Sequence, residues 1–218
     1  MKGKQKNQAI IFDLDGTMWD SREEVCRIWN RVFEKYPEVP LRVTMEDLNQ
    51  LMGKTMLEIG KELFPDREES FHVPLMDECG RAEAVSLRES GAKLYDNIEK
   101  TIALLKKSYD LYIVSNCQAG YIEAFLDAHG FRDDFKDYEL SGRTGLNKGE
   151  NIKLLMERNG ISRAVYIGDT AGDEQAARQA GIPFIYATYG FGQAHHPDRS
   201  IDSLSQLPEA AADLLEML

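Results

Sequence analysis

Short apolar runs alternate with helical patterns along most of the chain. Four of these runs are typical of buried strands, and they cover residues 9–12, 111–114, 164–167 and 184–187. The helical patterns among them cover residues 98–107, 121–129, 151–159 and 174–180. Strands that alternate with helices of this length are joined by parallel crossovers. The pattern therefore predicts an α/β fold whose core is a Rossmann-like, doubly wound parallel sheet.

One long helical stretch interrupts this alternation directly after the first strand. Its first apolar stripe has the i, i+3, i+4, i+7 spacing of an amphipathic helix and comprises Val25, Ile28, Trp29, Val32 and Phe33. Ser21 and Glu24 have the spacing of a capping box, which would begin this helix. Two further stripes fall within residues 56–63 and 75–82, with no strand pattern between them. The stretch therefore predicts a small helical bundle.

The length of 218 residues suits a large domain that carries a smaller one. We predict a helical domain at residues 20–91, inserted into a core that is formed by residues 1–19 and 92–218. Its two connections, near residues 18–21 and 90–97, would allow the helical domain to open and close over the core.

The charge balance argues against one broad class of partner. The chain has 26 Lys and Arg against 37 Asp and Glu, which gives a formal net charge of −11. Nucleic acids are bound through clustered basic residues, so we expect no nucleic-acid partner. The acidic excess would also slow the approach of an anionic substrate unless the binding cleft is locally positive.

The sequence indicates neither a membrane span nor a disulfide framework. Its apolar runs are much shorter than the ~20 residues that cross a bilayer, and residues 1–8 are polar with no apolar segment behind them. Cys26, Cys79 and Cys117 are widely spaced and form no CxxC pair, as expected of reduced thiols. We therefore expect a cytoplasmic protein with no membrane partner.

Polar and charged side chains stand where three of the predicted strands end. In chain order they are Asp13 and Asp15, then Ser115 and Asn116, then Asp169 with Asp173, while Lys148 opens the helix before the third of these strands. Ligands of a doubly wound sheet bind at the carboxyl ends of its strands. Because the strands are parallel, we expect these side chains to meet at one edge.

The acidic members of this set indicate a divalent cation. Asp13 and Asp15 flank Leu14, so their side chains face the same way if the chain is extended there. Carboxylates this close repel one another, and Asp169 on a neighbouring strand adds to the repulsion. Clustered carboxylate oxygens suit Mg²⁺, which often bridges to a substrate phosphate. Gly16 lets the backbone turn beside such a ligand.

The other members of the set suit a phosphate group. Ser115 and Asn116 can both donate hydrogen bonds to phosphate oxygens, and Lys148 adds a positive charge for the oxygens that gain charge during transfer. Taken singly, each residue has an ordinary structural explanation; Asp173, for example, is well placed to cap the helix that follows it. Their occurrence in order at successive strand ends favours phosphoryl transfer.

Four motifs resemble those of the haloacid dehalogenase superfamily of phosphatases, in the branch similar to phosphoglycolate phosphatase and β-phosphoglucomutase. They stand here as Asp13-Leu14-Asp15-Gly16-Thr17, Val114-Ser115-Asn116, Lys148 and Gly168-Asp169-Thr170-Ala171-Gly172-Asp173. The helical stretch between the first and second motifs resembles the helical cap domain of that branch. The resemblance extends from residue 9 to about residue 201.

The resemblance implies a reaction through an aspartyl-phosphate. Asp13 would attack phosphorus, and Asp15 would protonate the leaving alcohol and later deprotonate the water that cleaves the intermediate. Asp15 needs a proton at rest, which the neighbouring charge of Asp13 would help to hold. The presence of Asp15 favours phosphate esters over carbon–halogen bonds, because a halide needs no proton to leave.

The resemblance also implies the ligands of the cofactor and of the substrate. Mg²⁺ would be held by Asp13, Asp169 and the backbone carbonyl of Asp15, with Asp173 either ligating the ion or orienting its shell. The transferring phosphoryl group would be held by Thr17, Ser115, Asn116 and Lys148. Lys54, where this branch carries a substrate-reading loop, would reach a second anionic group; the alternative is an exposed lysine at a helix end.

Several alternatives stay open at this stage. We favour a phosphatase that acts on a small phosphorylated metabolite, either phosphoglycolate-like or a sugar phosphate, as a monomer or a homodimer. A phosphomutase would pass the phosphoryl group to a second hydroxyl, and a pyrophosphatase would differ only in the leaving group. A regulator that binds such a metabolite without turnover is a further alternative. Trp19 either packs at the connection between the domains or lines the pocket.

Overall fold

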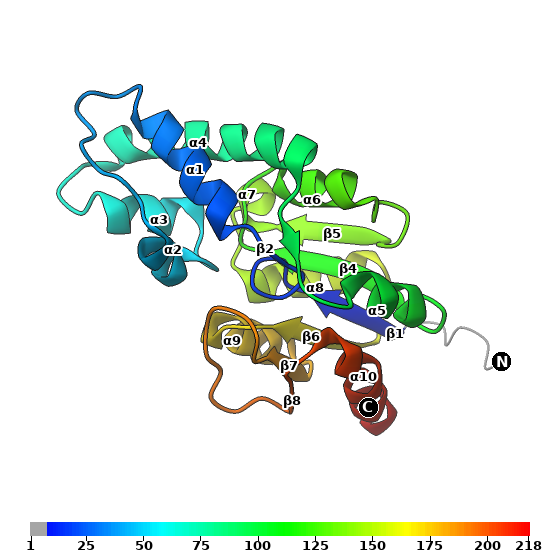
Figure 1. Ribbon diagram of the computed structural model, residues 1–218. Helices are drawn as coiled ribbons and strands as arrows, with labels where there is room; N and C mark the ends of the chain where they lie inside the picture. The colour runs from blue at the N-terminus through cyan, green and yellow to red at the C-terminus, as the bar shows by residue number, and fades with distance from the viewer. Residues whose placement is uncertain (1–7) are drawn as a thin grey trace.

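The computed structural model describes residues 8–218 and contains a six-stranded parallel sheet (Figure 1). Its strands are β1 (Gln8–Phe12), β4 (Asp110–Ser115), β5 (Asp137–Leu140), β6 (Arg163–Gly168), β7 (Phe184–Ala187) and β8 (Arg199–Ile201). The spatial order is β5-β4-β1-β6-β7-β8, so the chain reverses its direction across the sheet at β1. Phe12 pairs with Ile113 on one side and Ile167 on the other. The predicted doubly wound α/β fold is confirmed.

Helices cover both faces of this sheet because successive strand residues point to opposite sides. Ile10 and Phe12 of β1 belong to a buried cluster that includes side chains of α5 (Ile98–Leu105), α6 (Tyr121–His129) and α10 (Leu207–Met217). Ala9 and Ile11 belong to a second cluster, which includes side chains of α8 (Lys148–Arg158) and α9 (Ala171–Ala180). The result is a three-layer arrangement, and both strand faces are buried.

Residues 22–90 contribute only helices, and we call this segment the helical insert. Its helices are α1 (Arg22–Phe33), α2 (Met45–Leu51), α3 (Met56–Leu63) and α4 (Glu69–Ser90). The whole apolar stripe predicted for α1 is buried. Helix α4 packs against α1 and α3 within the insert and against α6 of the sheet layers. The insert therefore forms a layer of its own beside the sheet (Figure 1).

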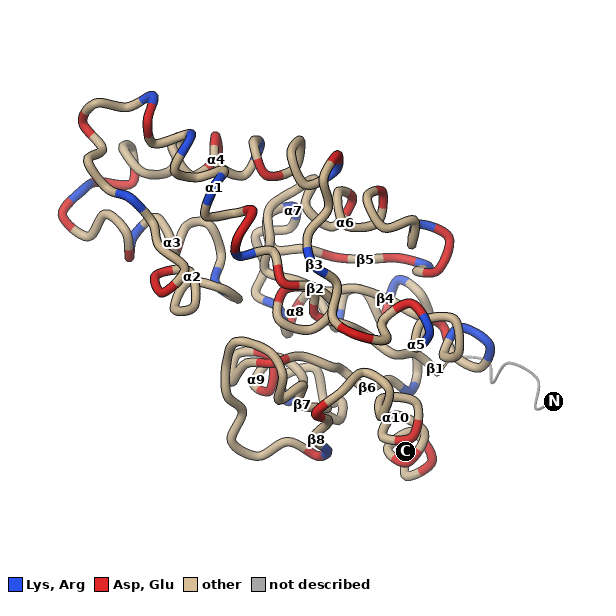
Figure 2. The backbone as a smooth tube through the Cα atoms, in the orientation of Figure 1, with Lys and Arg blue, Asp and Glu red and all other residues tan. Residues whose placement is uncertain are grey.

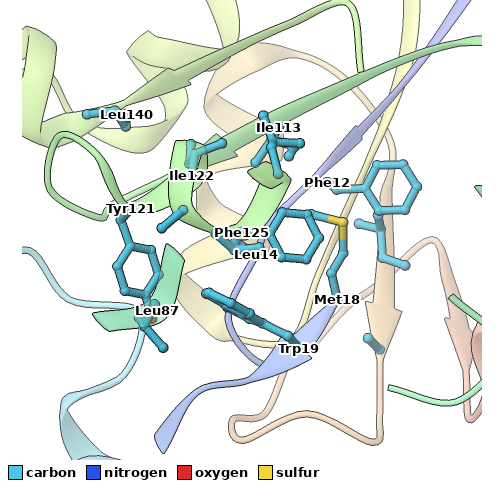
Figure 3. Packing of buried hydrophobic residues seen from close by; sticks show 14 of the residues in the cluster. Phe12, Leu14, Met18, Trp19, Leu87, Ile113, Tyr121, Ile122, Phe125 and Leu140 are labelled. Carbon is cyan, nitrogen blue, oxygen red and sulfur yellow. The ribbon is translucent and has the colours of Figure 1, made fainter. Parts of the chain in front are cut away.

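Two short strands join the insert to the sheet. β2 (Trp19–Asp20) and β3 (Lys93–Leu94) pair in antiparallel fashion, so the two connections lie side by side. Trp19 is fully buried and makes edge contacts with the rings of Tyr121 and Phe125 (Figure 3). Trp19 therefore packs at the connection, which is one of the two roles that the sequence suggested for it. The division into two domains near these connections stays a prediction.

One predicted local feature is wrong. Ser21 precedes α1, but its backbone is helical and its side chain makes no capping hydrogen bond. Its hydroxyl instead donates to Asp15 Oδ1 at 2.6 Å. A serine hydroxyl can bond to whichever acceptor the fold brings nearest, and the fold brings the half-buried carboxylate of Asp15 there.

The other elements that were not predicted are β2, α2, β3, β5, the short helix α7 (Ser141–Thr144), β8, a 3₁₀ helix at Leu204–Gln206 and α10. β5 and β8 are edge strands with polar ends, so their patterns are weak by themselves. Acidic and basic positions are spread over the insert and the sheet layers alike, and α10 carries several acidic ones (Figure 2).

The structure describes the helices and the cysteines but not the amino end of the chain. No helix within residues 8–218 is both long enough and apolar enough to cross a membrane. The cysteines at positions 26, 79 and 117 form no disulfide. Residues 1–7, on which the prediction about the polar amino end largely rests, lie outside the part of the chain that the structure describes.

Candidate active site

The strand-end residues meet at the switch point of the sheet, as predicted. Carboxylate oxygens of Asp13, Asp169 and Asp173 lie within 4.8 Å of one another, and all three side chains are buried. Lys148, at the first position of α8, places Nζ 2.9 Å from Asp13 Oδ1 and 2.6 Å from Asp173 Oδ1. We call these four residues the acid cluster. Its net charge is negative when all four side chains are ionised.

Close backbone packing holds Asp13 and Asp169 together. The Asp13 amide donates to the Ile167 carbonyl at 2.8 Å, which fixes the end of β1 against β6. Gly16 has a φ of 77°, and a Cβ there would lie 2.3 Å from Asp169 Oδ2. Any other residue at position 16 would both strain the backbone and displace that carboxylate.

Asp169 has one satisfied and one unsatisfied oxygen. Oδ2 accepts hydrogen bonds from the amides of Phe191 and Gly192, at 2.7 and 3.3 Å. Oδ1 is buried and has no hydrogen-bond partner among residues 8–218. Burial, followed by the charge of Asp173, raises the pKa of Asp169 to about 7. A buried carboxylate oxygen that faces other carboxylates suits a cation, so these residues fit a hard divalent metal ion.

Asp173 has two structural tasks. Its Oδ2 accepts hydrogen bonds from the Asp169 amide at 3.1 Å, the Thr170 amide at 3.0 Å and the Thr170 hydroxyl at 2.7 Å, which completes a capping box at the start of α9. Its Oδ1 pairs with Lys148. The N-cap is thus Thr170, and Asp173 contributes to the cap from the third position of α9, whereas the sequence suggested that it precedes the helix. The same carboxylate also positions the lysine.

The acid cluster shifts the pKa of its own members. Burial, followed by the charge of Asp173, raises the pKa of Asp13, while Lys148 opposes this shift. Burial alone would lower the pKa of Lys148, but Asp13 and Asp173 raise it above its ordinary value. The lysine therefore stays charged beneath Asp13 and compensates part of the buried negative charge.

Asp15 is not part of the acid cluster, and its side chain contacts other residues. Its Oδ1 accepts hydrogen bonds from Trp19 Nε1 at 2.8 Å, Ser21 Oγ at 2.6 Å and Tyr121 Oη at 2.9 Å. Burial raises the pKa of Asp15 to about 6, and the three donors oppose that shift. Burial, and not the charge of Asp13, is thus the leading reason why Asp15 holds a proton more readily.

The expected phosphate ligands are placed differently from one another. Ser115 is buried at the end of β4 beside Asp13. Asn116 Nδ2 donates to the Gly53 carbonyl at 2.8 Å, and Asn116 Oδ1 accepts from Ser141 Oγ at 2.9 Å. Asn116 therefore joins the sheet to the insert in this conformation. Thr17 is fully buried, and its hydroxyl has no partner within residues 8–218.

Two adjoining cavities lie between the insert and the strand ends. The inner cavity, of about 40 Å³, has Asp13, Asp15 and Ser115 on the sheet side and Trp29 and Glu83 on the insert side. The outer cavity is about 550 Å³ and is lined by neither Asp13 nor Asp15. Both cavities share a border formed by Met56, Asn116, Cys117 and Gln118.

Lys54 lines the inner cavity but does not point a free charge into it. Its ammonium forms an ion pair with Glu62 of α3, and its side chain is about one-third exposed. Sequence reasoning missed Glu83, Tyr121 and Ser21 as members of the site. An acidic residue directly after the apolar stripe of α4 was the available signal for Glu83; no local signal marked Tyr121.

The fold and these residues define an α/β enzyme with a carboxylate-centred site at the switch point of a Rossmann-like sheet. The family model for haloacid dehalogenase-like hydrolases matches residues 10–187. The chain belongs to this family, as its motifs predicted, and is therefore a hydrolase in class.

Known proteins similar to this chain carry related names. A phosphoglycolate phosphatase from Synechococcus elongatus is 29% identical over 217 residues, which cover 95% of this chain and 99% of the relative. A phosphoglycolate phosphatase from Photobacterium profundum is also 29% identical, over 226 residues that cover 95% of this chain and 96% of the relative. The crystal structure of a predicted phosphatase from Clostridium acetobutylicum superposes with a TM-score of 0.81 at 22% identity, covering 96% and 100% of the two chains.

Proposed function

We propose that this hydrolase is a Mg²⁺-dependent phosphatase that acts on a small phosphorylated metabolite. The observation that carries the proposal is the acid cluster, in which a buried lysine lies 2.9 Å from a carboxylate at the end of the central strand. The names of the relatives, phosphoglycolate phosphatases, support the reaction class. A cytoplasmic location and a monomeric or homodimeric state remain predictions.

The residues that would hold Mg²⁺ are Asp13, Asp169 and the backbone carbonyl of Asp15. The unpartnered Oδ1 of Asp169 supports this assignment. Asp173 Oδ2 accepts three hydrogen bonds and Oδ1 is paired with the Lys148 ammonium, which favours a positioning role for Asp173 over direct ligation. The bound ion would supply positive charge that lets a phosphate dianion approach these carboxylates.

Asp13 is the proposed nucleophile. Its free oxygen forms a bond to phosphorus while the bond from phosphorus to the leaving oxygen breaks, which leaves an aspartyl-phosphate. Asp15 gives its proton to the leaving alcohol and then takes one from the water that releases inorganic phosphate. A pKa of about 6 lets Asp15 occupy both protonation states near neutral pH. Lys148, Ser115, Asn116 and Thr17 are the proposed phosphoryl ligands.

The helical insert is the proposed cap over this reaction. The hydrogen bond from Asn116 to Gly53 and the small size of the inner cavity support a closed state that leaves little room for water. Exclusion of water would protect the reactive intermediate until the alcohol has left.

The test is turnover of nitrophenyl phosphate, measured as released phosphate. We expect turnover with Mg²⁺, none after chelation with EDTA, and recovery when Mg²⁺ is restored. Asp13→Asn should abolish turnover while the variant stays folded, and the exposed Asp133→Asn should behave as wild type. Turnover by folded Asp13→Asn at the wild-type rate would overturn the assignment. An isomer of a sugar phosphate in place of free phosphate would indicate a phosphomutase.

A further inference from the structure

A second buried carboxyl group lies across the inner cavity from the nucleophile. Glu83 of α4 is only 2% exposed and lines this cavity together with Asp13 and Asp15. Its Oε1 accepts a hydrogen bond from Trp29 Nε1 on α1, and its Oε2 accepts one from Gln118 Nε2 in the loop after β4. The proposed reaction uses neither of these two hydrogen bonds.

Close packing builds this arrangement into the fold. A Cβ at Gly80, one turn before Glu83 on α4, would lie 2.8 Å from Gln118 Cγ. A Cβ at Gly120 would lie 3.0 Å from Ala84 Cβ. The two glycines let α4 approach the loop closely enough for Gln118 to reach Glu83. The carboxyl group is thus held by one residue of the insert and one of the sheet layers.

The inner cavity offers no free cation to a leaving group. Lys54 is the only basic residue among its described lining residues, and Lys54 is paired with Glu62. Lys148 lies within the acid cluster, where Asp13 and Asp173 hold it. Apart from Gly53, Lys54 and Glu83, the residues of the insert that line this cavity are apolar: Val25, Trp29, Leu51, Met52, Met56 and Ile59.

Arg81 is the one basic residue among the described residues that line the outer cavity. A two-carbon leaving group spans only about 3 Å beyond the ester oxygen. Because neither Asp13 nor Asp15 lines the outer cavity, such a group on a phosphate at Asp13 lies in the inner cavity, on the Glu83 side of Gln118.

We propose that Glu83 recognises the leaving group by accepting a hydrogen bond from its hydroxyl or ammonium group. The enzyme then prefers phosphate esters of polyols or amino alcohols to phosphate esters of hydroxy acids. This inference rests on the proposed phosphatase function and narrows it. A carboxylate on the leaving group, as in phosphoglycolate, would face a buried acid, and both lysines near this cavity, Lys54 and Lys148, are already paired with carboxylates.

The preference depends on the ionised form of Glu83, which burial by itself disfavours. Burial raises the pKa of Glu83 to about 8, the hydrogen bonds from Trp29 and Gln118 oppose the shift, and the charge of Asp15 adds to it. A donor or a positive charge on the substrate would replace solvation that burial has removed. A second carboxylate would increase the cost of ionising Glu83.

Three esters of matched size test the proposal: phosphoglycolate, hydroxyethyl phosphate and phosphoethanolamine. We expect wild-type kcat/KM to be about tenfold or more higher for the latter two than for phosphoglycolate. Glu83→Lys should reverse this order of kcat/KM values, and Glu83→Gln should bring the three kcat/KM values closer together. The exposed Glu89→Lys on the same helix and Arg81→Ala should keep the wild-type order.

The outcomes separate this inference from the function on which it rests. If nitrophenyl phosphate is not hydrolysed with Mg²⁺, the proposed phosphatase function fails. If it is hydrolysed but phosphoglycolate is the preferred or an equal substrate, only the role of Glu83 fails. A folded Glu83→Gln that lowers kcat/KM for all three esters by one common factor would likewise show that Glu83 does not discriminate among them.

Discussion

The two sides of the inner cavity bury carboxyl groups in different ways. On the sheet side, the acid cluster contains three carboxylates and a buried ammonium group at 2.6 to 2.9 Å. On the insert side, the hydrogen-bond donors to Glu83 among the described residues are the neutral side chains of Trp29 and Gln118. A buried cation offsets part of the cost of burying charged carboxylates, and neutral donors offset less of that cost. The first arrangement suits chemistry on a phosphate, and the second suits recognition of a neutral or cationic group.

Removal of the buried cation should have the largest effect. Lys148→Met leaves Asp13 and Asp173 buried without a cation, so we expect a loss of about 3–5 kcal/mol in the free energy of unfolding at neutral pH. We also expect kcat to fall by about 10²- to 10³-fold. Urea denaturation and phosphate release measure the two effects.

Lys106→Met is the matched control, because Lys106 pairs with Asp134 at the surface. Its loss should cost less than about 1 kcal/mol. Equal destabilisation by the two variants would show that the buried lysine does not compensate the cluster.

The free energy of unfolding should depend on pH through Glu83 on the insert side, and Glu83→Gln should remove that dependence. The pKa of Glu83 is raised from 4.5 to about 8, so the folded state binds more protons than the unfolded state between these values. The free energy of unfolding of the wild type should therefore fall, relative to the Gln variant, as the pH rises through this window. The difference should be near zero below about pH 4 and on the order of 4 kcal/mol at about pH 9. A difference independent of pH would contradict the burial of an ionisable group here.

Mg²⁺ should stabilise the protein through the sheet side alone. At about 100 times its dissociation constant, a ligand of the folded state adds about 2.7 kcal/mol to the free energy of unfolding. We expect this gain in wild type and in Glu83→Gln, and its loss in Asp169→Asn. Thermal unfolding with and without Mg²⁺ measures it. If Mg²⁺ did not stabilise Glu83→Gln, the ion would depend on the insert side of the cavity, which contradicts the proposed site.

The contact between the two sides should have the smallest effect. Asn116→Ala removes the hydrogen bond to Gly53 and a proposed phosphoryl ligand, so kcat/KM should fall by about tenfold. Ser141→Ala leaves the Gly53 contact intact and should change kcat/KM less. If Ser141→Ala has the larger effect, the contact with the insert is not what matters at Asn116.

Local patterns predicted the central elements well. Helix α6 was expected at residues 121–129 and lies at Tyr121–His129, because an apolar face marks its length and Gly130, with a φ of 72°, ends it. β1, β4, β6 and β7 were found for a similar reason, since strands buried on both faces are apolar along their whole length. β5 was missed because its burial depends on pairing with β4.

Some residues of the candidate site could likewise be predicted from local patterns, and others could not. Asp13, Lys148, Asp169 and Asp173 could be chosen from the sequence, because parallel strands place their carboxyl ends at one edge whatever the side-chain packing. The partners of Asp15 could not, since Tyr121 lies more than 100 positions along the chain from it. The capping box expected at Ser21 failed for the same reason.

Amino-acid order alone thus determined the parallel sheet, the strand ends and the acidic and basic groups brought to them, because these follow from periodicity and chain direction. Tertiary structure alone decided which carboxyl groups hold a proton more readily and which side chains face the leaving group. Those properties depend on burial and on contacts between distant segments, such as α4 with the loop at Gln118, and no local pattern encodes them.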